Sequence, residues 1–165
     1  MADSLRDLYN TDPSLLSTFT DPHTIKGLAT TVADQELGKE MVSGGQTDAL
    51  RHLLGAATLA KRQGPSVAGT VLNWHENPNV FQFLGGGYGQ RENDRQMDLH
   101  NNALGMEIGQ KAKNYDEALN MAKQYIKEKK VRLAPKEPEA PVSKAIPEHD
   151  KNVTFKKWLD KYMSK

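Results

Sequence analysis

The stretch Asp48-Ala-Leu-Arg51-His52-Leu-Leu-Gly-Ala-Ala-Thr-Leu-Ala60 decides the fold class of this chain. Its leucine and alanine residues recur at helical spacing, and the small side chains would let a second helix approach closely. Asp48, Arg51 and His52 interrupt this apolar pattern. Because residues three and four apart share one face of a helix, these three side chains project together. The stretch therefore predicts a packed helix with polar side chains near its N-terminal end.

Two later segments carry similar polar interruptions. Trp74-His75-Glu76-Asn77 ends a short apolar pattern, and Met97-Asp98-Leu99-His100-Asn101-Asn102 lies early in a longer one. An unpaired polar group is costly inside a core. Three such segments in one small domain therefore predict a shared polar site, with two helix faces turned toward it.

The remaining sequence is also mainly helical in pattern. Apolar residues recur at helical spacing, and prolines and glycines mark the helix ends. Strand-like alternation is lacking. We therefore predict a mainly α fold, a compact multi-helix single domain, with helices over residues 3–9, 13–19, 22–42, 46–63, 66–75, 93–113 and 115–130.

Composition indicates how the chain divides. We expect one helical domain over residues 1–130, with a motif core over 45–110. Residues 131–148 are rich in proline and charge, which is typical of a flexible linker. Residues 149–165 predict an amphipathic C-terminal helix that folds back or binds a protein partner. The glycine-rich segment 77–93 is either a flexible flap over the site or a surface loop.

Charge and residue usage exclude several kinds of site. The chain of 165 residues has 22 basic and 21 acidic residues and no cysteine, which excludes thiolate catalysis and a cysteine-based zinc site. Residues 111–165 hold 14 basic residues interleaved with 8 acidic ones, so we expect no nucleic-acid partner. Neither a signal-peptide pattern nor a long apolar run is present, so we expect a soluble protein without a membrane span.

The polar motifs occur in the order Asp48-Ala-x-Arg51-His52, His75-Glu76 and Met97-Asp98-Leu99-His100-Asn101-Asn102-x-x-Gly105. As a set they resemble a small helical domain of unassigned function, found at the ends of bacterial wall-associated and polymorphic-toxin proteins and in some phage proteins. The likeness covers roughly residues 45–110. The resemblance implies a helical domain with a polar cluster and a hydrolytic or toxin-like role.

Three chemistries fit these residues. In the first, His52 is a general acid or base oriented by Asp48, and Glu76 is its carboxylate counterpart. The charge that develops in the transition state is then bound by Arg51 and by Asn101 or Asn102. This first chemistry makes the fewest demands on the sequence.

The second chemistry uses a divalent metal, held by His52, His75, Asp98 and in one version His100, to activate water. In the third, Glu76 alone is the general acid of a lysozyme-like glycosidase. The sequence assigns no cofactor with certainty, and a divalent metal is the one candidate. These two alternatives stay open at the level of sequence.

We predict a hydrolase of a bacterial polymer, peptidoglycan first, in a phage or toxin context. Its location would be the phage virion or the host cytoplasm or periplasm. The alternative is a non-enzymatic structural or accessory protein of a phage particle, which would dock on other virion proteins through its C-terminal arm. In that case the polar residues form a buried network that specifies the helical fold.

Overall fold

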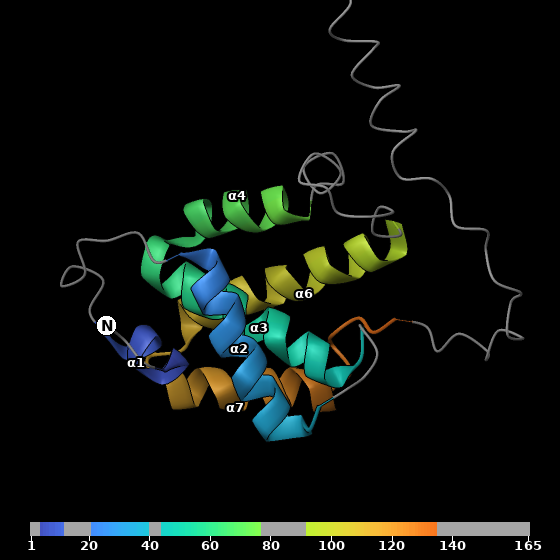
Figure 1. Cartoon of the computed structure of the whole chain (residues 1–165), viewed down its shortest axis with the longest axis horizontal. Coiled ribbons are helices and arrows are strands. Elements are labelled where there is room, and N and C mark those ends of the chain that lie inside the picture. The colour runs from blue at the N-terminus through green and yellow to red at the C-terminus, as the bar shows by residue number, and fades with distance from the viewer. Residues whose placement is uncertain (1–3, 12–20, 40–43, 77–91, 135–165) are drawn as a thin grey trace, which may run out of the picture. The chain divides into compact units, whose positions relative to one another are not determined.

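The computed structural model describes residues 4–11, 21–39, 44–76 and 92–134. Within these ranges the chain forms six helices and no strand, which confirms the mainly α prediction (Figure 1). The helices are α1 (Leu5–Asn10), α2 (Pro22–Leu37), α3 (Gln46–Gln63), α4 (Pro65–His75), α6 (Glu92–Lys111) and α7 (Tyr115–Lys127). None of these six helices has the length and apolar character of a membrane span.

Several predicted features lie outside the described residues. They are the helix over 13–19, the glycine-rich segment up to residue 91, the linker beyond residue 134 and the C-terminal helix. The helices described here belong to one compact unit, Met1–Ala134.

Helix α3 is the centre of this unit. All the other described helices pack against it, and the α3–α6 interface is the most extensive (Figure 1). Most α3 residues are buried, including Leu50, Leu53 and Leu54. The stretch from Asp48 to Ala60 therefore belongs to a core helix, and its polar residues are held in fixed surroundings.

Two glycines on α6 allow the close approach that the small residues of α3 predict. A Cβ atom on Gly105 would lie 2.5 Å from the backbone oxygen of Leu53, and one on Gly109 would lie 2.4 Å from that of Ala57. Any other residue at these two positions would push the helices apart. The close packing of α3 against α6 brings the polar side chains of the two helices together.

The prediction that the second helix reaches residue 42 is wrong. Helix α2 ends at Leu37, because Gly38 adopts a φ of +84°, which ends the helix and suits a residue without a Cβ atom. Its start is as expected. The side chain of Asp21 accepts hydrogen bonds from the backbone N–H groups of His23 and Thr24, and Pro22 occupies the first turn.

Residues 130–134, here called the C-terminal strap, are tied to the body by hydrogen bonds. The backbone N–H of Ala134 donates to the oxygen of Gly44 over 2.9 Å. Gly44 has a φ of +89°, and a Cβ atom there would lie 2.5 Å from that of Ala134. The linker is predicted from residue 131, whereas Arg132 is hydrogen-bonded to Asn101 of α6 and Ala134 to Gly44, two residues before α3 begins.

Candidate functional site

Asp48 is fixed in the first turn of α3. Its Oδ2 accepts the backbone N–H of Gly44 over 2.8 Å, and its Oδ1 accepts the Nε–H of Arg51 over 2.9 Å. The Nη2 of Arg51 also forms an ion pair with Oδ1. Both carboxylate oxygens therefore have partners, and a carboxylate is favoured at this end of a helix.

Opposing effects act on the pKa of Asp48. Burial is the largest and raises the pKa, but the charge and hydrogen bond of Arg51, the nearby His52 and the Gly44 N–H together outweigh it. The net result is a lowered pKa. Asp48 is therefore an ionised carboxylate at neutral pH.

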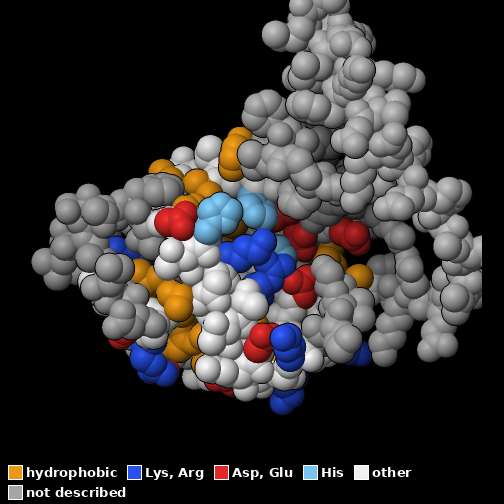
Figure 2. All heavy atoms as spheres, viewed as in Figure 1, with side chains coloured by type: hydrophobic (Ala, Val, Ile, Leu, Met, Phe, Trp, Pro, Cys, Tyr) orange, Lys and Arg blue, Asp and Glu red, His pale blue; other side chains and the backbone are white. Residues whose placement is uncertain are grey.

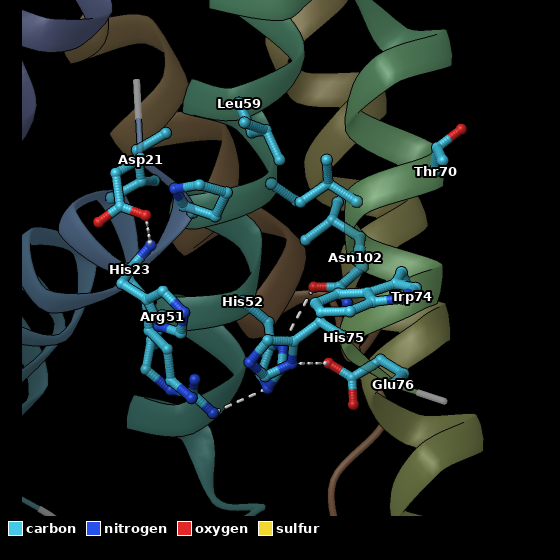
Figure 3. Close-up of a pocket in the computed structure, with 17 residues that line it drawn as sticks. Asp21, His23, Arg51, His52, Leu59, Thr70, Trp74, His75, Glu76 and Asn102 are labelled. Carbon is cyan, nitrogen blue, oxygen red and sulfur yellow. Dashed lines mark hydrogen bonds and ion pairs between the residues drawn. The ribbon is translucent and has the colours of Figure 1, made fainter. Parts of the chain in front are cut away.

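His52 has polar partners at both ring nitrogens. Nδ1 lies 2.9 Å from Oδ1 of Asn102, and Nε2 lies 2.8 Å from Nη2 of Arg51. A guanidinium group can only donate, so Nε2 accepts and Nδ1 carries the proton that Asn102 accepts. In this tautomer Nε2 is the basic atom of the ring; Figure 3 draws the contacts of the ring with Arg51 and Asn102.

Nε2 of His52 also faces two carboxylates. It lies 3.1 Å from Oδ1 of Asp98 on α6 and 4.0 Å from Oδ1 of Asp48. His52 is 8% exposed and Asp98 is 7% exposed, so both side chains are shielded from solvent. We call Asp48, Arg51, His52, Asp98 and Asn102 the polar cluster.

Part of the polar cluster could hold a metal ion. One ligand atom from each of Asp48, His52 and Asp98 lies within 4.8 Å of the others. Carboxylate oxygens and an imidazole nitrogen are suitable ligands for divalent zinc and other transition metals. Arg51 competes for the same atoms, because its guanidinium already contacts Asp48 and His52.

The polar cluster lies at a pocket of about 430 Å³ between α2, α3, α4 and α6. Arg51, His52 and Asn102 line it, as do His75 and Glu76 at the end of α4 (Figure 3). Figure 2 shows a group of histidine side chains on this side of the molecule, beside hydrophobic and basic ones. The structure thus brings polar residues from α3, α4 and α6 to one pocket.

Glu76 and His75 reach the pocket from the C-terminal end of α4. Glu76 is 5% exposed, and its Oε1 lies 3.3 Å from Nδ1 of His75. The side chain of Arg95 on α6 donates to the backbone oxygen of Glu76 over 3.1 Å. This contact holds the end of α4 against α6 and keeps the Glu76 carboxylate at the pocket.

Two predicted site residues on α6 lie outside the cluster. Asn101 is 1% exposed, but its amide donates to the backbone oxygen of Arg132 and accepts the N–H of the same residue, each over 2.9 Å. His100 places its Nε2 2.9 Å from the oxygen of Lys130. Both residues therefore hold the C-terminal strap, and neither is among the residues that line the pocket.

We expect Asn101→Ala to release the strap without disturbing the pocket. Losing both hydrogen bonds to Arg132 should lower the free energy of unfolding by about 1–3 kcal/mol. Hydrogen exchange at the Arg132 amide should accelerate, and chemical denaturation gives the stability. Asn120→Ala, on the exposed face of α7, is the control and should change neither quantity. Unchanged exchange in Asn101→Ala would contradict the assignment.

One known family model matches most of the helices of this structure. A family model described as Domain of unknown function (DUF6973) matches residues 17–132, which include α2, α3, α4, α6 and α7. The chain belongs to this family. No curated protein and no solved structure matches it. The match confirms a helical domain of unknown function, and it shows no toxin or phage context.

Within this DUF6973 domain, sequence reasoning missed several contacts. It did not anticipate that Asp48 would take His75's place in the possible metal group, or that Arg51 would contact His52 directly. It also missed the lining residues from the start of α2, among them His23 and Lys26. Nothing in their local pattern distinguishes them, because they reach the pocket only through the packing of α2 on α3.

Proposed function

We propose that the pocket is the active site of a hydrolase in which His52 is the general base. The observation that carries this proposal is the state of the His52 ring. Its Nδ1 is occupied by Asn102, while the basic Nε2 faces Asp98 at the edge of a pocket. An imidazole held in one tautomer by a neighbouring side chain is typical of acid/base catalysis.

The proposed step uses water and residues of this chain only. Nε2 of His52 takes a proton from water as the water oxygen bonds to the electrophilic atom of the substrate. Asp98 and Asp48 stabilise the imidazolium that forms. Glu76 in its acid form gives a proton to the leaving group as the scissile bond breaks. The two residues then return to their starting states by exchange with solvent.

Arg51 must move for this step to occur, because it occupies Nε2 of His52 in the structure. Its side chain lines the pocket and is 20% exposed, so it has room to turn. An electronegative oxygen of a bound substrate would attract the guanidinium and uncover the base before the proton is taken, and the guanidinium would then lie beside the negative charge as it develops. Arg51 thus has the role of binding transition-state charge, together with Asn102.

The substrate that we propose to test first is a bacterial polymer, peptidoglycan above others, in the phage or toxin context that the resemblance implies. The test is incubation of the full chain with purified cell walls, with soluble fragments measured over time. Release of fragments supports the hydrolase. Intact walls in the presence of folded protein would count against this substrate.

Metal-assisted hydrolysis is the second candidate, favoured by the closeness of Asp48, His52 and Asp98. Because Arg51 already supplies positive charge there, we expect EDTA, zinc and calcium to leave the melting temperature of the wild type unchanged. Arg51→Ala frees ligand atoms and should gain a zinc-dependent rise. Thermal melts measure both effects.

The control for these melts is the double variant His52→Ala/Asp98→Asn, which removes two of the three ligands and should not respond to metal. A zinc-dependent rise in the wild type that is lost in this variant would replace the metal-free mechanism with the metal-assisted one.

A structural or accessory role in a phage particle is the non-enzymatic candidate. The observation in its favour is how completely Asp48 is hydrogen-bonded within the chain. In that case the polar cluster would specify the fold, and its variants would lose stability without any activity to lose. Binding to other virion proteins through the C-terminal arm would be the property to measure.

A further inference from the structure

The pocket has an apolar wall that the proposed chemistry does not use. Helices α2 and α4 both pack on α3 but pack little on each other, which leaves the space between them. Its volume of about 430 Å³ falls within the range of small-molecule sites, about 300–1,000 Å³. Aliphatic side chains from all three helices face it: Ile25, Ala56, Leu59, Val71 and Leu72.

This wall favours an aliphatic group over a sugar ring. Each hydroxyl of a sugar would lose its water hydrogen bonds against aliphatic side chains, which is unfavourable. A hydrocarbon chain placed there gains by leaving water. Trp74, the aromatic residue in the lining, is 57% exposed and belongs to the rim rather than to the wall.

Asn102 supplies a polar atom for the same ligand. Its Oδ1 accepts from His52, so its Nδ2 must point elsewhere. Asn102 is 2% exposed, and its Nδ2 is fully buried. This atom has no hydrogen-bond partner among the described residues. A buried N–H donor without a partner is unfavourable unless an oxygen accepts from it. Because Asn102 is a lining residue, a shift of its side chain toward the pocket would give Nδ2 a ligand oxygen as acceptor.

We propose that the pocket binds an acyl group, with the carbonyl oxygen at Nδ2 of Asn102 and the aliphatic chain against α2 and α4. As an account of the substrate, this rests on the proposed hydrolase. The scissile bond is then an amide or ester next to an aliphatic chain, rather than a glycosidic bond.

Binding of small amide probes tests this inference and does not require that the protein hydrolyse them. N-methyloctanamide carries a carbonyl and an aliphatic chain, N-methylacetamide carries the carbonyl alone, and a chito-oligosaccharide supplies sugar rings. Isothermal titration calorimetry on the full chain should give N-methyloctanamide an affinity at least about ten-fold above that of N-methylacetamide. The oligosaccharide should not compete with it.

Two variants locate the probe. Asn102→Asp keeps an acceptor for His52 but replaces the Nδ2 donor with oxygen, and should weaken N-methyloctanamide by about ten-fold. Val71→Asn places an amide in the wall and should have a similar effect. Val67→Asn, on the same helix at a position that is 42% exposed and not in the lining, is the matched control and should bind as the wild type does.

The outcomes separate this inference from the proposed function. Binding that depends on the aliphatic chain of the probe and on Val71 of the protein supports the pocket assignment. If no acyl compound is hydrolysed at the same time, the result counts against the hydrolase. Equal affinity for both amides, competition by the oligosaccharide, or an unaffected Val71→Asn variant would overturn the acyl pocket. Should Asn102→Asp fail to fold, Val71→Asn still decides.

Discussion

Replacing His52 by alanine is expected to abolish hydrolysis, with a loss of about 10²–10⁴-fold in rate. The variant lacks the atom that accepts the proton from water, and neither carboxylate beside it can take its place in the same position. Glu76→Gln should be similarly inactive, because the amide has the shape of the acid but cannot donate its proton to a leaving group. Initial rates on purified cell walls measure both losses.

Thermal melts of the same proteins show whether this loss is chemical. We expect both variants to remain folded, with changes in stability much smaller than the change in rate. His100→Ala removes a histidine that contacts Lys130 outside the pocket, so it should keep wild-type activity. Equal and large losses of stability in His52→Ala and Glu76→Gln would instead identify the polar cluster and Glu76 as a structural network.

Gly109→Ala is expected to lower the free energy of unfolding by about 2–3 kcal/mol. The added Cβ atom would lie 2.4 Å from the backbone oxygen of Ala57, and backbone cannot turn aside as a flexible side chain does. Helices α3 and α6 would have to separate. Chemical denaturation measures the loss, which is a large part of the stability of a typical domain.

Gly27→Ala is the control for this prediction. Gly27 also lies within a helix, but nothing is within 4 Å of the position its Cβ would take. Alanine is the better helix former, so this variant should be more stable by about 0.5–1 kcal/mol. If Gly109→Ala were as stable as the wild type, the close approach of α3 and α6 would be wrong.

Much of the fold could be predicted from the sequence because the helices carry regular apolar patterns. The span of α3 follows directly from its leucines and alanines and from the Gly64-Pro65 pair that ends it. The end of α2 could not be predicted, because the apolar pattern runs past Gly38 and only its positive φ stops the helix. Glycine permits this conformation but does not require it, so the sequence alone leaves open whether the helix ends at Gly38.

The candidate site was predictable in part. Spacing on one helix correctly places Asp48, Arg51 and His52 together, since three and four residues make one turn. Asn101 and Asn102 could not be told apart, because both are buried amides on the same helix. Which of them contacts His52 depends on the rotation of α6 against α3, and the partner of the other, Arg132, is 31 residues away in the sequence.

The central claim is that the polar cluster and its pocket perform hydrolysis at an acyl bond. Mass spectrometry of the fragments that the wild-type chain releases from purified peptidoglycan, beside those from His52→Ala, tests it most directly. We predict fragments with new amine and carboxylate ends from the wild type and none from the variant. New reducing sugar ends, fragments that persist in His52→Ala, or intact peptidoglycan beside a folded wild-type chain would contradict it.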